Sequence, residues 1–589
     1  MTILPAIAIS AVVLTLAYAV YGRLVVRWLG VDASRPTPAV TMDDGNDFVP
    51  AAPGVVLGGH FTAIAAAGPI LGPIIAGLMF GWLPALLWIL LGAIFIGGVH
   101  DSGALLASIR HRAQSITQVV REHMSPTAYV TFLMFVWLSL IYVIIAFTDV
   151  TAATFAKFTS FEETRDGITR SFSLNGGAVA IGATGYLLAS VSMGLLLRRT
   201  KAPWWLLLVI HFAGLVATIQ FAPAMASWLA GHGLSFLDTQ ATAGAGLVKW
   251  WDMGLLIYCF IASMVPMWIL LQPRGVIGAT FLYAALLFGV LGTLIGGWDG
   301  AGSLAVQYPA FKGFFSAEGA ALFPFLFITI ACGACSGFHS VVASGTTCKQ
   351  LRSERDIKPV AYGAMLLEAM VAIFALSCVM VLPATTKAGA PDLVYAHGIA
   401  NFMGFIGIDK QFALGFGLLA FSSFVFDTLD VCTRLGRYVF QELTGLQGML
   451  GGAIATLATI AGPAVYLWHA PADWGFRTFW TIFGTSNQLL AALTLVGVSV
   501  WLWRTGRPVW FALLPAGFML ASTATALVMN FLAFQKQYRA AVAALKPAAP
   551  ILVNMIVAVV LLGLGLLVVF EAARVWAKSR AAAQPLAAD

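Results

Sequence analysis

Very few titratable residues lie inside the long apolar stretches of this sequence. Among them are His60, the neighbours His100 and Asp101, and His339. An ionisable group is costly to bury alone in lipid, so one that persists there is usually paired or functional. A histidine beside a carboxylate can bind and release a proton near neutral pH. We therefore expect His100 and Asp101 to relay a proton, and the alternative is an inert hydrogen-bonded pair near the end of a helix.

The segment FPFLFITIACGACSGFHSVVASGTTC combines hydroxyl, thiol and imidazole side chains with many small residues. In a continuous helix, Ser336 and Ser340 would lie one turn apart on a shared face, where their hydroxyl groups could coordinate a cation. Close packing of small residues is the alternative. Cys332, Cys335 and His339 would also share a face, but no fourth ligand for a soft metal ion is evident. We therefore expect no bound metal there.

The stretch 58–77 is long and apolar enough to cross a bilayer, but it contains the steps Gly68-Pro69 and Gly72-Pro73. Proline removes a backbone donor and obstructs the carbonyl one turn back. The freed backbone groups need partners that lipid does not supply, and in secondary transporters such broken helices build the substrate site. The two glycine–proline steps therefore predict a broken helix beside a polar cavity.

This broken helix predicts a substrate site. Backbone amides at the ends of half-helices attract anions, so the unwound segment would hold a carboxylate, and two histidines would contact the substrate or carry a proton. The substrate-binding candidates are His60, Gly68, Pro69, Gly72 and His339. The ion-coupling candidates are Asp101, His100, Ser336 and Ser340.

Other polar residues in apolar runs have structural interpretations. Asp430 and Arg434 have the spacing of a helical ion pair, and we expect a solvated pair at a cytoplasmic helix end, with a gate latch as the alternative. Asn487 and Gln488 need hydrogen-bond partners, and we expect them to link neighbouring helices rather than cap a broken one. Glu368 is the only acid in its apolar run, and no partner for it is evident.

The composition assigns the chain to a membrane. Of 589 residues, 60% are hydrophobic and only 10% are charged, whereas roughly a quarter of a soluble globular protein is charged. The net charge of +7 comes from Lys and Arg at the ends of apolar runs, so no nucleic-acid partner is expected. The first apolar run has no basic segment before it and is expected to be a span rather than a signal peptide.

Apolar runs of about 20 residues predict fifteen membrane-spanning helices. They are 2–22, 57–80, 83–109, 126–150, 174–198, 203–229, 250–271, 276–296, 322–347, 360–383, 411–431, 449–468, 478–503, 509–532 and 551–576. Most Lys and Arg fall in alternate loops, which the positive-inside rule places in the cytoplasm. The N terminus is therefore expected outside and the C terminus inside.

The direction of these helices and their breaks predict an inverted repeat. The second and seventh helices run in opposite directions, and Pro266 interrupts the seventh. The expected domains are an N-terminal helix with a cytoplasmic linker (1–56), two five-helix halves (57–229 and 250–431), a four-helix extension (449–576) and a cytoplasmic tail (577–589).

Five motifs, in this order, resemble the carbon starvation protein A (CstA) family: GGHFTAIAAAGPILGP, GGVHDSGALLASIRHR, CFIASMVPMWILLQPR, FLFITIACGACSGFHSVVASGTT and FGTSNQLLAAL. The likeness runs from about Gly58 to Leu493. It implies an all-α polytopic membrane protein similar to the amino acid, polyamine and organocation transporters, with a leucine-transporter-like five-plus-five inverted repeat, one N-terminal helix and several C-terminal helices. The residues it marks are His60, Gly68, Pro69, Gly72, Pro73, Asp101, Pro266, Ser336, His339, Ser340, Asn487 and Gln488.

The resemblance implies uptake of peptides or pyruvate during carbon starvation, with proton coupling. We therefore expect a symporter, not an enzyme, which imports a small carboxylate or peptide through a bacterial cytoplasmic (inner) membrane by alternating access. No cofactor is expected beyond a coupling proton or sodium ion. The expected partners are the substrate and the lipid bilayer, and the oligomeric state is left open. The alternatives are a membrane-embedded nutrient sensor and a metal-dependent membrane protein that uses Cys332, Cys335 and His339.

Overall fold

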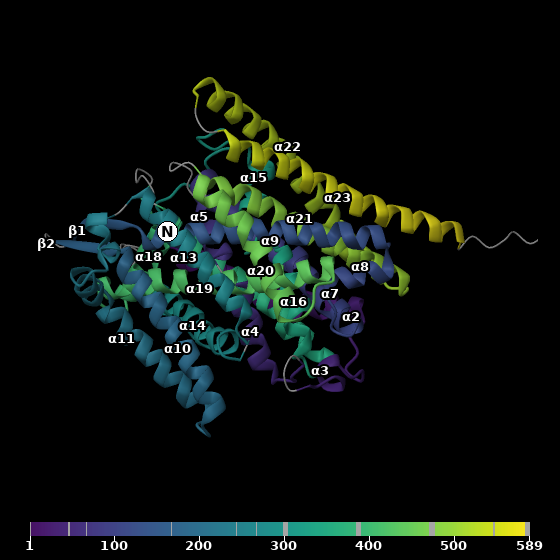
Figure 1. Cartoon of the computed structure of the whole chain (residues 1–589), viewed down its shortest axis with the longest axis horizontal. Coiled ribbons are helices and arrows are strands. Elements are labelled where there is room, and N and C mark those ends of the chain that lie inside the picture. The colour runs from purple at the N-terminus through teal and green to yellow at the C-terminus, as the bar shows by residue number, and fades with distance from the viewer. Residues whose placement is uncertain are drawn as a thin grey trace, which may run out of the picture.

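The computed structural model is helical along most of the chain. It describes residues 2–44, 48–65, 67–165, 168–242, 244–266, 268–297, 304–383, 390–470, 477–545 and 548–582. The part of the predicted tail beyond residue 582 lies outside these residues. Most helices run between two ends of the molecule (Figure 1). One end carries β1 (Phe158–Arg165) and β2 (Ile168–Asn175), and the other carries α2 (Tyr21–Leu29) and α8 (Ile116–His123).

Thirteen helices among the described residues are long and apolar enough to cross a membrane. They are α1 (Leu4–Ala19) with α2, α6 (Trp82–Gly92) with η1 (Ala93–Gly97) and α7 (Gly98–Arg110), α9 (Pro126–Phe155), α10 (Gly176–Arg199), α11 (Trp204–Gly231), α13 (Ala245–Met264), α14 (Leu271–Gly296), η5 (Lys358–Gly363) with α17 (Ala364–Met380), α19 (Lys410–Thr444), α20 (Gly448–His469), α21 (Arg477–Arg504), α22 (Trp510–Ala543) and α23 (Ala549–Ala582). The bent pair α4 (Pro53–Ile64) and α5 (Gly68–Phe80) meets the same criteria when its two helices are taken together, which gives fourteen spans if the pair crosses as one. The predicted fold class, an all-α polytopic membrane protein, is confirmed.

A short antiparallel hairpin, which the sequence did not reveal, joins α9 to α10. Phe158 lies opposite Asn175 in its register. The Asn175 side chain then caps α10 by accepting a hydrogen bond from the Gly177 amide at 2.8 Å. The other short elements are α3 (Pro38–Thr41), η2 (Ser235–Leu237), α12 (Thr239–Thr242), α15 (Leu322–Thr329), α16 (Gly337–Gly345), η3 (Thr347–Lys349), η4 (Glu354–Asp356) and α18 (Pro391–Gly404).

The first broken helix consists of α4 and α5, which meet at a 45° bend. The predicted interruption is confirmed, but it lies before Gly68 rather than at the two glycine–proline steps. Proline is tolerated in the first turn of a helix, where its missing N–H would have no partner, so Gly68 and Pro69 begin α5. Pro73 lies inside α5 without ending it. Gly72 instead permits close packing, because a Cβ there would lie 2.6 Å from the Thr329 carbonyl oxygen.

The second broken helix is α15–α16, whose halves are separated by residues 330–336. The prediction of a continuous helix over 322–347 is therefore wrong. The predicted break at Pro266 is also wrong, because Pro266 lies in the connection between α13 and α14, where no helical hydrogen bond is required. The two broken helices touch at their breaks, since a Cβ on Gly333 would lie 3.7 Å from Pro69 Cα.

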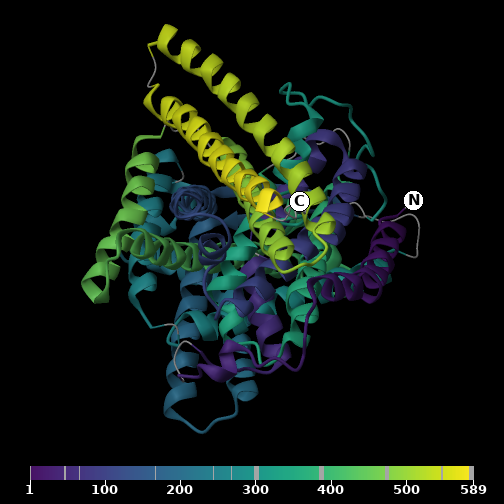
Figure 2. The same ribbon diagram turned by 90° about the vertical axis from the view of Figure 1, so that its right-hand side faces the viewer.

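The centre of the bundle is formed by α9, α17, α19 and α21. The central parts of α19 and α21 are almost entirely buried, whereas few residues of α1 and α11 are buried. Helix α9 packs against α19, α20 and α21, and α17 packs against α5. The hairpins α10–α11 and α22–α23 project from opposite sides of the bundle (Figures 1 and 2). The irregular backbone of both breaks is thus surrounded by protein, which lets it persist at membrane depth.

Candidate functional site

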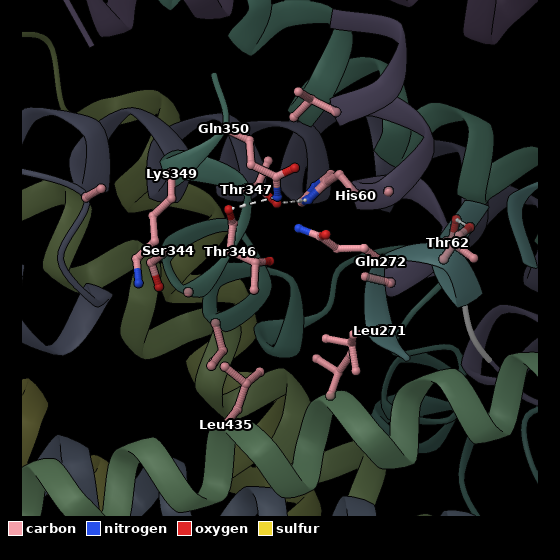
Figure 3. Close-up of a pocket in the computed structure, with 18 of the residues that line it drawn as sticks. His60, Thr62, Leu271, Gln272, Ser344, Thr346, Thr347, Lys349, Gln350 and Leu435 are labelled. Atoms are coloured by element: carbon pink, nitrogen blue, oxygen red, sulfur yellow. Dashed lines mark hydrogen bonds between the residues drawn. The ribbon is translucent and has the colours of Figure 1, made fainter. Parts of the chain in front are cut away.

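A cavity of about 730 Å³ lies between the helices α4, α14, α16 and α19. Figure 3 shows its wall, with His60 from α4, Gln272 from the start of α14 and Leu435 from α19. The segments 113–118 and 344–350 complete the wall at the end of the molecule that carries α8. The cavity therefore extends from that end into the bundle, as far as His60.

His60 lines the inner part of this cavity. Its side chain is 2% exposed, and its Nδ1 atom lies 2.8 Å from Thr347 Oγ1. Its Nε2 atom is buried and has no hydrogen-bond partner among the described residues. The Gln272 side chain points into the same space (Figure 3). Because a buried polar atom without a partner is costly, this nitrogen is suited to bind a polar group of a ligand.

Four buried titratable side chains form a chain across α7, α16 and α17. His100 Nδ1 lies 2.7 Å from Asp101 Oδ1, and His339 Nδ1 lies 2.9 Å from Asp101 Oδ2. His339 Nε2 in turn lies 3.3 Å from Glu368 Oε2. All four side chains are fully buried. The structure thus brings the predicted residues His100, Asp101 and His339 together and adds Glu368, whose partner the sequence did not reveal.

Hydrogen-bonding rules restrict where the protons of this chain lie. An ionised carboxylate only accepts hydrogen bonds, so both Nδ1 atoms that face Asp101 carry a hydrogen. His339 Nε2 and Glu368 Oε2 lie 3.3 Å apart but make no hydrogen bond, and a proton bound by this pair would reside on the imidazole as an ion pair or on the carboxyl group as a neutral pair. Transfer of a proton between the two groups would need only a small adjustment of their side chains, because they are already 3.3 Å apart. The arrangement is therefore suited to proton relay.

A second charged cluster forms part of the cavity wall where α14 begins. Arg274 Nε lies 2.5 Å from Asp427 Oδ1 of α19, and Arg274 Nη1 pairs with Asp430. The Tyr258 hydroxyl donates to Asp430 at 2.8 Å, and the Tyr186 hydroxyl lies 3.2 Å from both carboxylate oxygens of Asp427. Arg274 is 1% exposed. One buried guanidinium thus neutralises only one of two buried carboxylates.

The predicted ion pair between Asp430 and Arg434 is not formed. Arg434 Nη2 instead donates to the carbonyl groups of Ala262 and Val265, at 2.7 and 2.6 Å, at the end of α13. This part of α19 is buried rather than solvated, so residues one turn apart satisfy their charges on different neighbouring helices. Arg274, expected in a cytoplasmic loop, is the actual partner. Its only signal in the sequence is an isolated arginine between two apolar runs.

Side chains from α21 and α6 cap the break between α15 and α16. Asn487 Oδ1 accepts a hydrogen bond from a backbone amide in the first turn of α16 at 2.9 Å. Gln488 Nε2 donates to the Phe327 carbonyl of α15 at 2.6 Å. The indole groups of Trp88 and Trp480 donate to two further carbonyls of the break. Asn487 and Gln488 therefore cap a broken helix, and because the same bonds join α21 to α15 and α16, they also link helices as predicted.

The two serines predicted to coordinate a cation both face α21. Ser336 Oγ accepts a hydrogen bond from Asn487 Nδ2 at 2.9 Å, and Ser340 Oγ lies 3.1 Å from Thr494 Oγ1. Both are fully buried. They thus help to hold α16 against α21, and their role in ion coupling stays a prediction.

The soft-metal alternative required a continuous helix. Because residues 330–336 are not helical, Cys332 and Cys335 do not share a helix face with His339. Cys332 Sγ lies 3.5 Å from Asn487 Nδ2. Within the described part of the chain, these three side chains form no group whose ligand atoms could reach one ion together. The geometry does not support this alternative.

The structure separates the five predicted substrate-binding residues. His60 is the only one of them that lines the cavity in the part of the chain that the structure describes. Gly68, Pro69 and Gly72 are buried where the two broken helices touch, and His339 belongs to the buried titratable chain. Direct contact of these four residues with substrate stays a prediction.

Comparisons with known proteins extend over most of this chain. Residues 3–392 and 383–526 match the model of the family described as Carbon starvation protein CstA. The chain is 31% identical over 536 residues to Peptide transporter CstA of Bacillus subtilis (strain 168), covering 83% of each chain. It is 29% identical over 627 residues to Pyruvate/proton symporter BtsT of Escherichia coli (strain K12), covering 90% of this chain and 81% of the relative. The solved structure of MhsT in complex with L-phenylalanine superposes with a TM-score of 0.49 and 12% identity, covering 80% of this chain and 98% of that one.

Proposed function

The chain belongs to the carbon starvation protein CstA family, and from this premise we propose that it is a secondary active transporter that imports pyruvate or a short peptide. Relatives carry the names Peptide transporter and Pyruvate/proton symporter. Both substrate classes carry a carboxylate, which needs hydrogen-bond donors or positive charge. The observation that carries the proposal is the cavity that reaches His60, whose Nε2 atom has no partner in the described structure.

Recognition of the carboxylate would begin at the inner end of this cavity. The His60 imidazole and the Gln272 amide are the hydrogen-bond donors available there. The volume of about 730 Å³ is typical of a small-molecule site and admits pyruvate or a dipeptide. Binding to His60 would give the buried nitrogen the partner it lacks, which favours the loaded state.

We propose that the coupling ion is a proton carried by the His339–Glu368 pair. Its support is the distance of 3.3 Å between His339 Nε2 and Glu368 Oε2, together with the bond from His339 to Asp101. Asp101 would fix the orientation of His339 and stabilise its charged form. His100 would fix Asp101 from the other side. A sodium ion is the competing coupling ion, and the experiment below includes it.

We propose that the chain lies in a bacterial cytoplasmic membrane with its N terminus outside and its C terminus inside. The support is the positive-inside rule, since the α8 end of the molecule carries Arg110, Arg112 and Arg121. In this orientation the cavity faces the cytoplasm, which corresponds to an inward-facing state of alternating access.

We propose a division of the inverted repeat that differs from 57–229 and 250–431. One half would comprise α4–α5, α6–α7, α9, α13 and α14, and the other α15–α16, η5–α17, α19, α20 and α21. Packing supports this division, because the last member of each half packs on the first member of its own half and on the third member of the other half. Thus α14 packs on α4 and α19, and α21 packs on α16 and α9. The second member of each half also contains a π-helical segment, η1 or η5. The hairpin α10–α11 would be an insertion in the first half.

Uptake by the purified full chain in proteoliposomes tests the function. Labelled pyruvate and a labelled dipeptide would be supplied outside, under a pH gradient, a sodium gradient or neither. We expect one of the two substrates to accumulate under the pH gradient and to exchange in counterflow without it. Failure of both substrates to enter under every gradient and in counterflow would overturn the proposal.

A matched pair of histidine variants tests the carboxylate site. His60→Gln removes the imidazole ring from the cavity wall, and His469→Gln changes an exposed histidine at the end of α20. Loss of one hydrogen bond to a charged group costs about 1.5–3 kcal/mol, so we expect the KM of the His60 variant to rise by at least about tenfold. Equal KM values for the two variants would remove His60 from the site.

A further inference from the structure

A group of potential metal ligands lies outside the cavity, where α7 ends and α8 folds back. Arg112 and Ala113 follow α7 with φ values of 57° and 54°. Two successive non-glycine residues in the left-handed region are uncommon and strained. They reverse the chain so that His111, at the end of α7, meets Glu122 and His123 at the end of α8. The fold thus maintains a strained turn that juxtaposes three metal-binding side chains.

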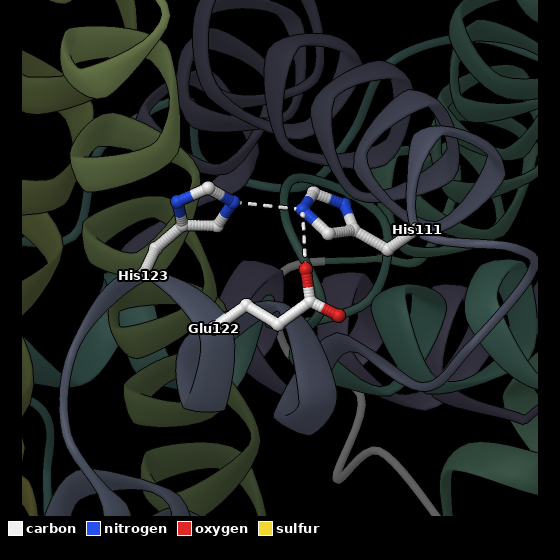
Figure 4. A group of neighbouring side chains, drawn as sticks. All are labelled: His111, Glu122 and His123. Carbon is white, nitrogen blue, oxygen red and sulfur yellow. Dashed lines mark hydrogen bonds and ion pairs between the residues drawn. The ribbon is translucent and has the colours of Figure 1, made fainter.

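The ligand atoms of these side chains converge on one point (Figure 4). His111 Nε2 lies 2.7 Å from His123 Nε2 and 3.6 Å from Glu122 Oε2. One ligand atom from each residue lies within 4.8 Å of the others, and this is the single such group among the described residues. A tetrahedral metal site with bonds of about 2.0–2.1 Å to nitrogen therefore needs the two rings to separate only slightly.

The surroundings of the two rings favour metal coordination over a permanent hydrogen bond. His111 Nδ1 lies 2.6 Å from the Ala107 carbonyl oxygen, so Nδ1 carries the hydrogen and Nε2 presents its lone pair. Metal-binding histidines are commonly oriented by such a bond from the other ring nitrogen. His123 Nδ1 is buried without a hydrogen-bond partner in the described structure.

We propose that His111, Glu122 and His123 bind a Zn²⁺ ion at the cytoplasmic end of the protein. Two imidazole rings and one carboxylate form a nitrogen and oxygen ligand set that suits Zn²⁺. The Glu122 side chain is 53% exposed, so water can occupy the fourth position. Arg504 acts on His123 electrostatically, and its positive charge weakens binding of a cation. We therefore expect a dissociation constant of about 1–10 µM, weaker than that of a closed structural site.

The ion would hold one wall of the substrate cavity in place. Ser115 and Gln118, from the turn and from α8, line the cavity. Gln118 Nε2 also donates to Glu442 Oε1 of α19 at 2.7 Å. By tying the end of α8 to the end of α7, Zn²⁺ would fix the position of this wall against α19. The site is thus placed to regulate access from the cytoplasm.

Zn²⁺ binding to the full-length protein, purified in detergent without a histidine tag and stripped with a chelator, tests the site directly. We expect isothermal titration calorimetry to show one Zn²⁺ per chain, and Co²⁺ to give the visible absorption of a tetrahedral nitrogen and oxygen site. Loss of an outer partner costs about 10–100-fold in metal affinity, so we expect His123→Ala, which removes a ligand, to weaken binding by about 100-fold or more.

Two further variants complete the test. Glu122→Gln changes an exposed side chain, so the protein should stay folded, and we expect it to bind about tenfold more weakly. His232→Ala is the control, because His232 is exposed and its Nδ1 atom also faces a carbonyl oxygen one turn back, at 2.8 Å. Absence of binding by the wild type at 100 µM Zn²⁺ (about tenfold above the expected constant), or equal binding by wild type, His123→Ala and Glu122→Gln, would overturn the proposal. Because transport is not the readout, failure here leaves the proposed transport function standing.

Discussion

Replacing Arg274 with methionine would leave Asp427 and Asp430 buried without their cation. Breaking a buried ion pair by removing one partner costs about 3–5 kcal/mol, because an uncompensated charge stays behind. For 589 residues, an unfolding entropy of roughly 2.1 cal/mol/K per residue gives about 1.2 kcal/mol/K. We therefore expect the melting temperature to fall by about 2–4 °C.

Scanning fluorimetry of the protein in detergent measures this shift. The triple variant Arg274→Met, Asp427→Asn, Asp430→Asn removes all three charges, and we expect its melting temperature to return to within about 1 °C of the wild type, since a whole buried pair can often be replaced at little cost. Arg574→Met is the control, because the Arg574 side chain is 56% exposed. We expect it to change the melting temperature by less than about 1 °C.

The comparison of the single and triple variants separates charge from packing. If the cost comes from two stranded carboxylates, neutralising them must recover stability. A melting temperature of Arg274→Met equal to that of the wild type would refute the buried charge cluster. A triple variant less stable than Arg274→Met would show that the stabilisation comes from packing of the arginine side chain instead.

Three more predictions concern the relay and the two broken helices. Glu368→Gln removes the proton site beside His339. We therefore expect uptake driven by a pH gradient to be lost, while the counterflow rate stays within about twofold of the wild type. Unchanged uptake under the pH gradient would exclude this carboxyl group from coupling. Gln488→Leu leaves a backbone carbonyl of α15 without its hydrogen-bond donor, at a cost of about 1–3 kcal/mol. The melting temperature in detergent should therefore fall by about 1–2 °C. An unchanged melting temperature would mean that this cap does not contribute to stability. Gly72→Ala places a Cβ against the end of α15 and should destabilise the folded protein by about 1–3 kcal/mol. Gly58→Ala is the control and should not change the stability, because Gly58 has open space around it. Equal melting temperatures of the two variants would contradict the close approach of the two broken helices.

The spans could be predicted because each depends on its own residues. An apolar run of about 20 residues is costly to expose to water and long enough to cross lipid, so 126–150 anticipates α9 and 449–468 anticipates α20. The first broken helix was anticipated near Gly68 for the same local reason, because proline alters the hydrogen bonds of its own helix. The pairing of His100 with Asp101 also follows from adjacency in the chain.

The partners of buried charges could not be predicted from neighbouring positions. Asp430 is one turn from Arg434, yet its charge is satisfied by Arg274, which is 156 residues away. The same holds for Glu368 and His339, which lie on different helices. A buried charge in a membrane protein pairs with the opposite charge that helix packing places beside it. That partner cannot be identified from the spacing of residues along one helix.

The class of the protein and the positions of most of its spans follow from the residues alone, because hydrophobicity and proline act within a single segment. The place of the second break does not. Residues 330–336 leave the helix where Asn487 and Gln488, about 150 positions later, satisfy the freed amides and carbonyls. Non-helical backbone persists at membrane depth only when other parts of the protein supply its hydrogen-bond partners. The position of this break is therefore determined by the tertiary structure.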